Sequence, residues 1–145
     1  MLKTLLMHIS KIFVTVDIIL IKETNPKQVL LIQRNNEPFK NCWALPGGFV
    51  NENEDLEMAA KRELEEETQI KVERLTQIGA YGKPFRDPRG HMVSVAYFGV
   101  TNENTIAKAN DDAKEANWFN IINLPELAFD HKDIINDAIQ KHNLL

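Results

Sequence analysis

The sequence predicts an α/β (α+β) fold in which a mixed β-sheet is sandwiched between helices. Several short runs are rich in β-branched residues, a charged helical segment lies mid-chain, and an amphipathic segment lies near the end. With 145 residues, 43% of them hydrophobic, the chain can bury one substantial core. We therefore expect residues 1–145 to form a single domain.

The first two strands are expected to pair as a hairpin. Ile12 to Ile21 is an apolar, β-branched run, and Val29 to Gln33 continues it after an Asn25-Pro26 turn. Gly47 and Gly48 follow Pro46 and supply the backbone freedom of a sharp turn. The remaining strands are expected at residues 43–45, 49–50, 74–83, 93–101 and 116–119.

A helix is expected from about Asp55 to Thr68, and a second one near Asp130 to His142. Asn53 is the expected N-cap of the first helix. Its apolar stripe consists of Leu56, Ala59, Ala60 and Leu64.

The first helix carries an acidic face. Glu63, Glu66 and Glu67 stand at positions i, i+3 and i+4 and share one side of the helix, whereas Arg62 is expected to point to a different face from Glu63 and Glu67. Each like-charge pair at this spacing destabilises a helix by about 0.2–0.5 kcal/mol. A hard divalent cation would offset this repulsion, because Mg²⁺ takes oxygen ligands. The simpler interpretation is a solvated helix face.

The acidic face belongs to a longer pattern that resembles the Nudix hydrolase family. The pattern reads Gly48, five residues, Glu54, seven residues, Arg62-Glu63-Leu64, any residue, Glu66-Glu67, and ends at Ile70. Gln69 is the one departure, since the family has glycine there. This position follows the helix, where a left-handed cap favours glycine, so the departure concerns stability and removes no metal ligand. The resemblance implies a mixed sheet between helices.

The resemblance also assigns site residues. The Gly48 carbonyl and the carboxylates of Glu63, Glu66 and Glu67 would hold Mg²⁺ or Mn²⁺, and Glu54 would pair with Arg62 to brace the loop. The general base is expected to be Glu66, or Glu115 in the polar loop before the strand at 116–119. For the loop acids Asp111, Asp112 and Glu115, simple solvation is an equal alternative.

Two further segments look like those of bacterial ADP-ribose pyrophosphatases of this family: residues 85–90, Phe-Arg-Asp-Pro-Arg-Gly, and residues 127–131, Leu-Ala-Phe-Asp-His. Arg34, Arg86 and Arg89 are the expected substrate-binding residues, because a guanidinium fork suits phosphate. An Arg-Asp salt-bridged turn is the alternative for 85–90. The aromatic candidates for stacking on a base are Phe13, Phe39, Trp43 and Phe85.

The activity that the resemblance implies is hydrolysis of the pyrophosphate bond in a nucleoside diphosphate linked to another group. ADP-ribose, cleaved to AMP and ribose 5-phosphate, is the preferred substrate. The alternatives are a nucleoside-triphosphate pyrophosphatase that removes damaged nucleotides, and a non-catalytic ADP-ribose or sugar sensor. The sensor is disfavoured because no DNA-binding domain is expected and the glutamate set is intact.

The expected partner is a small nucleotide-type substrate. The net charge of −4 disfavours a nucleic-acid surface, and the single Cys42 suits a reducing compartment. The apolar run at 12–21 is too short for a membrane span and contains Asp17. We therefore expect a cytoplasmic protein without a membrane or nucleic-acid partner, and the resemblance favours a homodimer.

Overall fold

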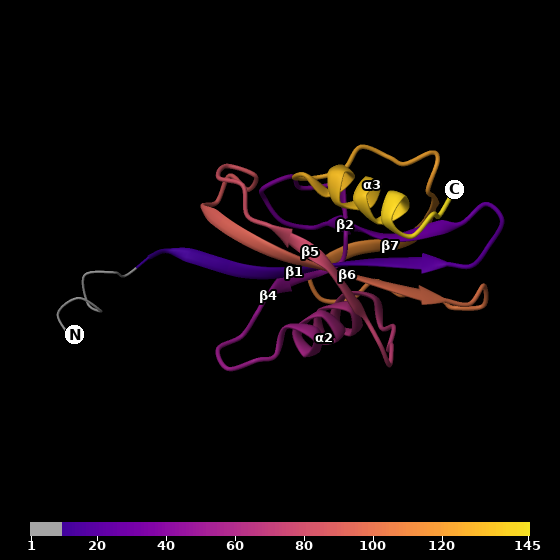
Figure 1. Ribbon diagram of the computed structural model, residues 1–145, viewed down its shortest axis with the longest axis horizontal. Coiled ribbons are helices and arrows are strands. Elements are labelled where there is room, and N and C mark those ends of the chain that lie inside the picture. The colour runs from indigo at the N-terminus through magenta and orange to yellow at the C-terminus, as the bar shows by residue number, and fades with distance from the viewer. Residues whose placement is uncertain (1–9) are drawn as a thin grey trace.

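The computed structural model of the chain describes residues 10–145, so positions 1–9 of the expected domain lie outside it. Within this range, a seven-stranded mixed sheet lies between two helices, with α2 (Leu56–Thr68) and α3 (His131–Lys141) on opposite sides (Figure 1). The fold class is therefore as predicted. The strands are β1 (Ile12–Lys22), β2 (Gln28–Arg34), β3 (Trp43–Ala44), β4 (Gly47–Phe49), β5 (Thr76–Tyr81), β6 (His91–Thr101) and β7 (Ala113–Asn120).

Strand β1 is the central element of the sheet. It pairs in parallel with β6 from Ile12 to Lys22, and its C-terminal end forms the expected antiparallel hairpin with β2. On the same side as β2, but nearer the start of β1, the short strand β4 pairs with Thr15–Asp17. The strand order is β3-β2-β1-β6-β5, with β7 added to β2. Gly47 and Gly48 were expected in a sharp turn, but they lie in β4 without a left-handed φ, and this topology holds them against the middle of β1.

The sheet buries both of its faces, which explains why β1 is an almost continuous apolar run. Val16, Ile18 and Leu20 pack toward α2, whereas Ile19 and Ile21 pack toward α3. This is the two-residue periodicity of a strand. Asp17 falls on the α3 face and is 7% exposed, so a carboxylate lies at the border of the core.

The ends of the helix α2 test two predictions. Its N-cap is Asp55, whose carboxylate accepts a hydrogen bond from the Met58 N–H at 3.2 Å. The prediction that Asn53 is the N-cap is wrong, because Asn53 lies in the preceding turn with φ +62°. At the other end Gln69 is the left-handed C-cap, with φ +61°, and its N–H donates to the Glu65 carbonyl at 2.8 Å. The prediction for Gln69 is confirmed.

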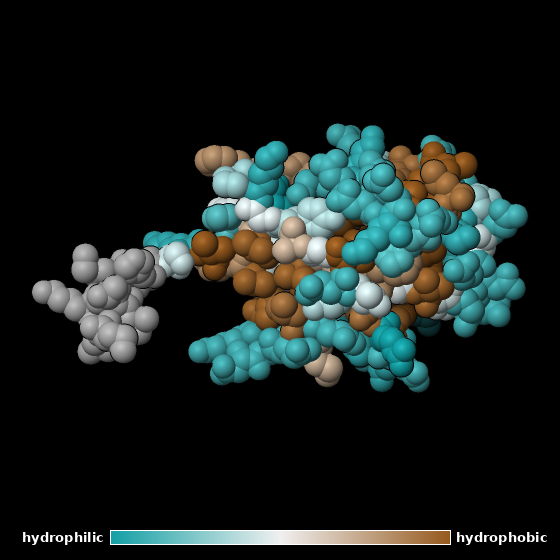
Figure 2. Space-filling view, in the orientation of Figure 1, coloured by the Kyte–Doolittle hydropathy of each residue, from teal (hydrophilic) through white to brown (hydrophobic). Residues whose placement is uncertain are grey.

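The face shown in Figure 2 carries both hydrophilic and apolar side chains, and one group of apolar side chains lies at the end of the sheet where β1 begins. Ile12, Phe13 and Val14 are exposed there. None of the helices between residues 10 and 145 is long and apolar enough to cross a membrane.

Candidate active site

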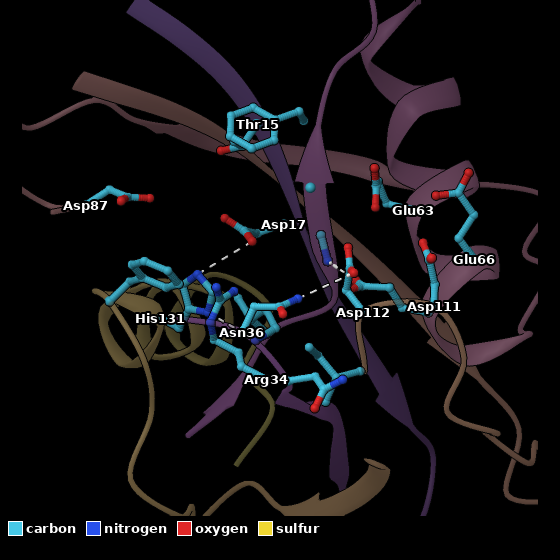
Figure 3. Close-up of a pocket in the computed structure, with 18 of the residues that line it drawn as sticks. Thr15, Asp17, Arg34, Asn36, Glu63, Glu66, Asp87, Asp111, Asp112 and His131 are labelled. Atoms are coloured by element: carbon cyan, nitrogen blue, oxygen red, sulfur yellow. Dashed lines mark hydrogen bonds and ion pairs between the residues drawn. The ribbon is translucent and has the colours of Figure 1, made fainter. Parts of the chain in front are cut away.

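A cavity of about 310 Å³ opens where β4, the C-terminal half of α2 and several loops meet. Figure 3 shows Glu63 and Glu66 on one side of it, and Arg34 and His131 on the other. The cavity therefore has an acidic side on α2 and an opposite side that carries Arg34, Arg86 and Arg89, which we call the basic side. Its lining comes from β1, β2, β4 and α2 and from the loops around residues 35–37, 86–89, 111–112 and 129–131.

The acidic side is the helix face that the sequence predicts. Glu63, Glu66 and Glu67 all line the cavity. Arg62 donates to Glu63 at 2.8 Å and to Glu66 at 3.2 Å. Arg62 was expected on a different face from Glu63, but its long side chain reaches forward along the helix to the residues one and four positions ahead.

Arg62 also forms the expected pair with Glu54. Two nitrogens of its guanidinium donate to the two carboxylate oxygens of Glu54 at 2.6 and 2.8 Å, and one donates to the Phe49 carbonyl at 3.0 Å. Glu54 in turn accepts from the Asn51 N–H at 2.9 Å. The hydrogen bond from Arg62 is the main reason why the pKa of Glu54 falls to about 2. This network ties the loop after Gly48 to the helix.

Glu67 is the most buried of the three acids, at 5% exposure. It accepts a hydrogen bond from the Gly47 N–H at 2.8 Å. Burial raises its pKa to about 8, the Gly47 N–H opposes this, and the charges of Glu63 and Asp17 add to it. Burial also raises the pKa of Glu63, although Arg62 counteracts it. The acidic side is thus short of positive charge.

The two glycines of β4, Gly47 and Gly48, allow the backbone to lie directly against these acids. A Cβ atom at Gly48 would lie 2.5 Å from the Glu63 carboxylate, and one at Gly47 would overlap the Val16 carbonyl. Any larger residue at these positions would push β4 away from α2 and β1. The Gly48 backbone is therefore close enough to the acidic side to share a ligand with it.

The donor chemistry of this side fits a hard divalent cation, since every candidate ligand is an oxygen and Glu67 is buried with too little positive charge around it. In the part of the chain that the structure describes, no three Asp, Glu, His or Cys side chains converge on one point. Glu63 and Glu66 instead bond to Arg62. A cation would have to compete with Arg62 for these two carboxylates.

The loop acids lie differently from the prediction. Asp111 and Asp112 line the cavity, whereas Glu115 does not. Glu115 is exposed on β7, opposite Gln33 of β2, because this strand starts at Ala113 rather than at residue 116. The geometry therefore does not favour Glu115 as the base.

All three predicted arginines line the cavity, but two are already paired. Arg86 is 5% exposed at its side chain and bonds to both oxygens of Asp130, at 2.8 and 2.6 Å. Arg89 bonds to both oxygens of Asp87, at 3.1 and 2.7 Å. The salt-bridged turn considered for residues 85–90 is therefore present.

Arg34 is the exception on the basic side. Its Nε donates to the Pro38 carbonyl at 2.8 Å, and within residues 10–145 its two terminal nitrogens have no acceptor. Burial lowers its pKa, and the charge of Arg89 lowers it further. Arg34 is thus the pocket arginine whose fork is open to an anion.

A buried polar group also lines the cavity: Asp17, which interrupts the apolar run of β1, and His131, for which the sequence indicated no role in the site. Asp17 accepts a hydrogen bond from the Ser94 hydroxyl, and its other oxygen lies 3.5 Å from His131 Nε2. His131 Nδ1 accepts from the Leu45 N–H at 3.0 Å, so the ring proton is on Nε2. Burial lowers the pKa of His131 and keeps the ring neutral. His131 therefore anchors the backbone just before β4.

The aromatic candidates from the sequence lie outside the cavity lining, which contains Phe49 and Phe129 instead. Trp43 packs on Phe119 with ring centroids 4.7 Å apart, and Phe85 is 95% exposed. Phe13 and Phe39 lie behind the lining, against Phe49 and Phe129 respectively. Phe129 lies in the segment 127–131 that the sequence analysis singled out, and Phe49 directly follows Gly48, but only long-range contacts bring both rings to the cavity.

Comparisons with known proteins agree with this geometry. The family model described as NUDIX domain matches residues 11–138. The chain is 47% identical over 116 residues to an ADP-ribose pyrophosphatase of Methanocaldococcus jannaschii, covering 80% of this chain and 68% of that protein. It is 39% identical to the ADPR responsive transcriptional repressor NtrR of Acinetobacter baylyi, over 80% of this chain and 48% of the repressor. The chain thus spans about half the length of the repressor.

Solved structures of two relatives are also similar. The NUDIX domain of Shewanella oneidensis NrtR, complexed with ADP-ribose, is 31% identical with a TM-score of 0.85, over 92% of this chain and 90% of that one. A bifunctional NMN adenylyltransferase/ADP-ribose pyrophosphatase from Francisella tularensis, complexed with AMP and a manganese ion, is 31% identical with a TM-score of 0.82. It is matched over 96% of this chain and 45% of its own.

Proposed function

Because the chain belongs to the Nudix hydrolase family, we propose that it hydrolyses ADP-ribose to AMP and ribose 5-phosphate with the help of Mg²⁺ or Mn²⁺. One observation carries this proposal: the acidic side of α2 and the guanidinium of Arg34, whose terminal nitrogens are free to bind an anion, face each other across one cavity. A bound diphosphate requires cations near its oxygens. It also requires hydrogen-bond donors, such as a guanidinium, for the phosphate whose charge the metal does not neutralise.

The Gly48 carbonyl, Glu63, Glu66 and Glu67 would hold the cation. When bound, the cation neutralises phosphate charge and lowers the pKa of a coordinated water. Arg34 would bind a phosphate through its terminal nitrogens, while Arg86 and Arg89, fixed by Asp130 and Asp87, would shape the basic side.

One water is consumed, one phosphoric anhydride bond breaks, and a proton must leave the attacking water. Glu66 is the best-placed acceptor among the predicted bases, because its carboxylate lines the cavity and is less buried than that of Glu67. Glu115 stays a weaker prediction, since it lies on β7 away from the lining.

Similarity to the Methanocaldococcus pyrophosphatase, and to the Francisella enzyme bound to AMP and manganese, supports an enzyme of this class. Similarity to the NrtR proteins supports a second candidate, an ADP-ribose sensor. The complete set of glutamates around Gly48 favours catalysis over sensing, because a sensor needs to bind its ligand but not to activate water.

A substrate panel tests the proposal. ADP-ribose, NADH, a dinucleoside polyphosphate, a sugar nucleotide and dGTP would be incubated with the protein and Mg²⁺ or Mn²⁺, and the phosphate products identified by chromatography. We expect the highest kcat/KM with ADP-ribose. Preference for dGTP would instead support the nucleotide-sanitising alternative, and tight ADP-ribose binding without turnover would support the sensor.

The cytoplasmic location and the homodimer that the resemblance implies are also proposals. The single Cys42 is compatible with a reducing compartment. Light scattering of the purified protein would test the oligomeric state, with a mass of twice 16.6 kDa expected for the dimer.

A further inference from the structure

One wall of the cavity combines two phenyl rings with a guanidinium. Phe49 follows Gly48 on β4, and Phe129 precedes α3; both line the cavity. The central carbon of the Arg89 guanidinium lies over both rings, 5.4 Å from the Phe49 centroid and 5.5 Å from the Phe129 centroid. Arg89 is held in place by Asp87. The wall therefore alternates ring, cation and ring.

Phe49 is the open member of this wall. It is 43% exposed although it lines a cavity, so much of its apolar surface has no protein partner. Its backbone is rigid, because it pairs with Thr15 on β1 and its carbonyl accepts from Arg62 at 3.0 Å. The ring of Phe13 supports it edge-on, with centroids 6.3 Å apart and planes at 81°. Phe49 is thus a pre-positioned aromatic surface.

Phe129 is more enclosed than Phe49, and its ring contacts another phenyl ring and two guanidinium groups. The Phe39 ring lies 4.8 Å away and the Arg34 guanidinium 5.0 Å away, in addition to Arg89. Its backbone has φ +53°, a left-handed conformation that is unfavourable for an aromatic residue. Neighbouring structure must impose this conformation, and its effect is to put one ring in contact with both arginines.

We propose that the planar base of the nucleotide substrate stacks on Phe49, and that Phe129 is a positioning residue that keeps Arg34 and Arg89 directed into the cavity. This inference rests on the proposed function, because it requires that the ligand is a nucleotide. Every base has a π face, so stacking on a phenyl ring accepts different bases, and a neighbouring guanidinium strengthens such a surface. Phe49 would then provide affinity for the base and Arg34 affinity for phosphate.

Calorimetric titration with AMP and with ribose 5-phosphate, both in the presence of Mg²⁺, separates these roles, because the two ligands share a ribose phosphate and differ in the base. Wild type should bind AMP more tightly. Phe49→Leu should lose about 5- to 150-fold in AMP affinity and leave ribose 5-phosphate binding unchanged. Phe49→Tyr should retain AMP binding. The matched control is Phe85→Leu, because Phe85 is exposed and lies outside the lining.

Phe129→Leu should weaken both ligands, because both carry the phosphate that Arg34 binds. Equal effects of Phe49→Leu on the two ligands, or wild-type binding of AMP no tighter than that of ribose 5-phosphate, would overturn the stacking role. An effect of Phe129→Leu on AMP alone would overturn its positioning role. The titration needs no turnover, so failure of the hydrolase proposal in the substrate panel would be a separate result.

Discussion

Replacing Glu67 with glutamine should make the metal-free protein more stable at alkaline pH. The pKa of Glu67 is about 8 in the folded state, against an ordinary value of 4.5. Between these two pH values the folded state holds a proton that the unfolded state has released, so stability falls as the pH rises. Glutamine is neutral at every pH and can still accept the Gly47 hydrogen bond. The stability of the variant should therefore lack this dependence.

The size of the effect follows from the displaced pKa. One pH unit corresponds to about 1.4 kcal/mol, which gives an upper limit of about 4–5 kcal/mol above pH 8. Solvent screening in an open cavity reduces this to about 1–3 kcal/mol, or roughly 2–12 °C in Tm for a chain of this length. Protonated Glu67 resembles glutamine, so the two proteins should have similar stability near pH 5.

The assay is thermal unfolding of wild type and Glu67→Gln at pH 5 and pH 8.5, with EDTA or with Mg²⁺. Mg²⁺ should raise the Tm of wild type at pH 8.5 much more than that of the variant, because the cation needs the ionised carboxylate. The reasoning is refuted if the variant is no more stable than wild type in EDTA at pH 8.5. It is also refuted if Mg²⁺ stabilises both proteins equally.

Three other substitutions test separate parts of the site. Arg62→Ala should lower Tm and kcat together, because Glu54 loses its partner and the loop after Gly48 loosens; an unchanged Tm would contradict the brace. Gln69→Gly should stabilise the protein by about 1 kcal/mol without changing kcat, since Gln69 has φ +61°, and denaturant unfolding would measure it. Glu115→Gln should leave kcat and Tm near their wild-type values. A large drop in kcat would instead indicate that Glu115 is the general base.

The acidic side of the site could be predicted because its geometry is local. Helical periodicity alone puts Glu63, Glu66 and Glu67 on one face, and the cavity is found there. The left-handed cap at Gln69 follows from the same local rules. The N-cap was misplaced by two residues, because both Asn53 and Asp55 are good caps and only the turn before the helix decides between them.

The basic side could not be predicted in the same way, because its partners are distant in sequence. Arg86 pairs with Asp130, 44 positions away, and His131 binds the backbone of Leu45, 86 positions away. The segment before α3 is brought to the site by pairing with Trp43, where the Ala128 N–H donates to the Trp43 carbonyl at 2.8 Å. The sequence Phe-Asp-His at 129–131 could be singled out from the sequence alone, but no local rule predicts which distant residues it contacts.

The central claim, metal-dependent cleavage of a phosphoric anhydride on the acidic side of the cavity, is tested most directly by ADP-ribose hydrolysis as a function of Mg²⁺ concentration. The experiment compares wild type with Glu67→Gln and quantifies AMP and ribose 5-phosphate. We predict equal amounts of both products from wild type, none without a divalent cation, and a rate lower by orders of magnitude for the variant. Near-wild-type turnover by Glu67→Gln at saturating Mg²⁺, or hydrolysis by wild type in EDTA, would contradict the claim.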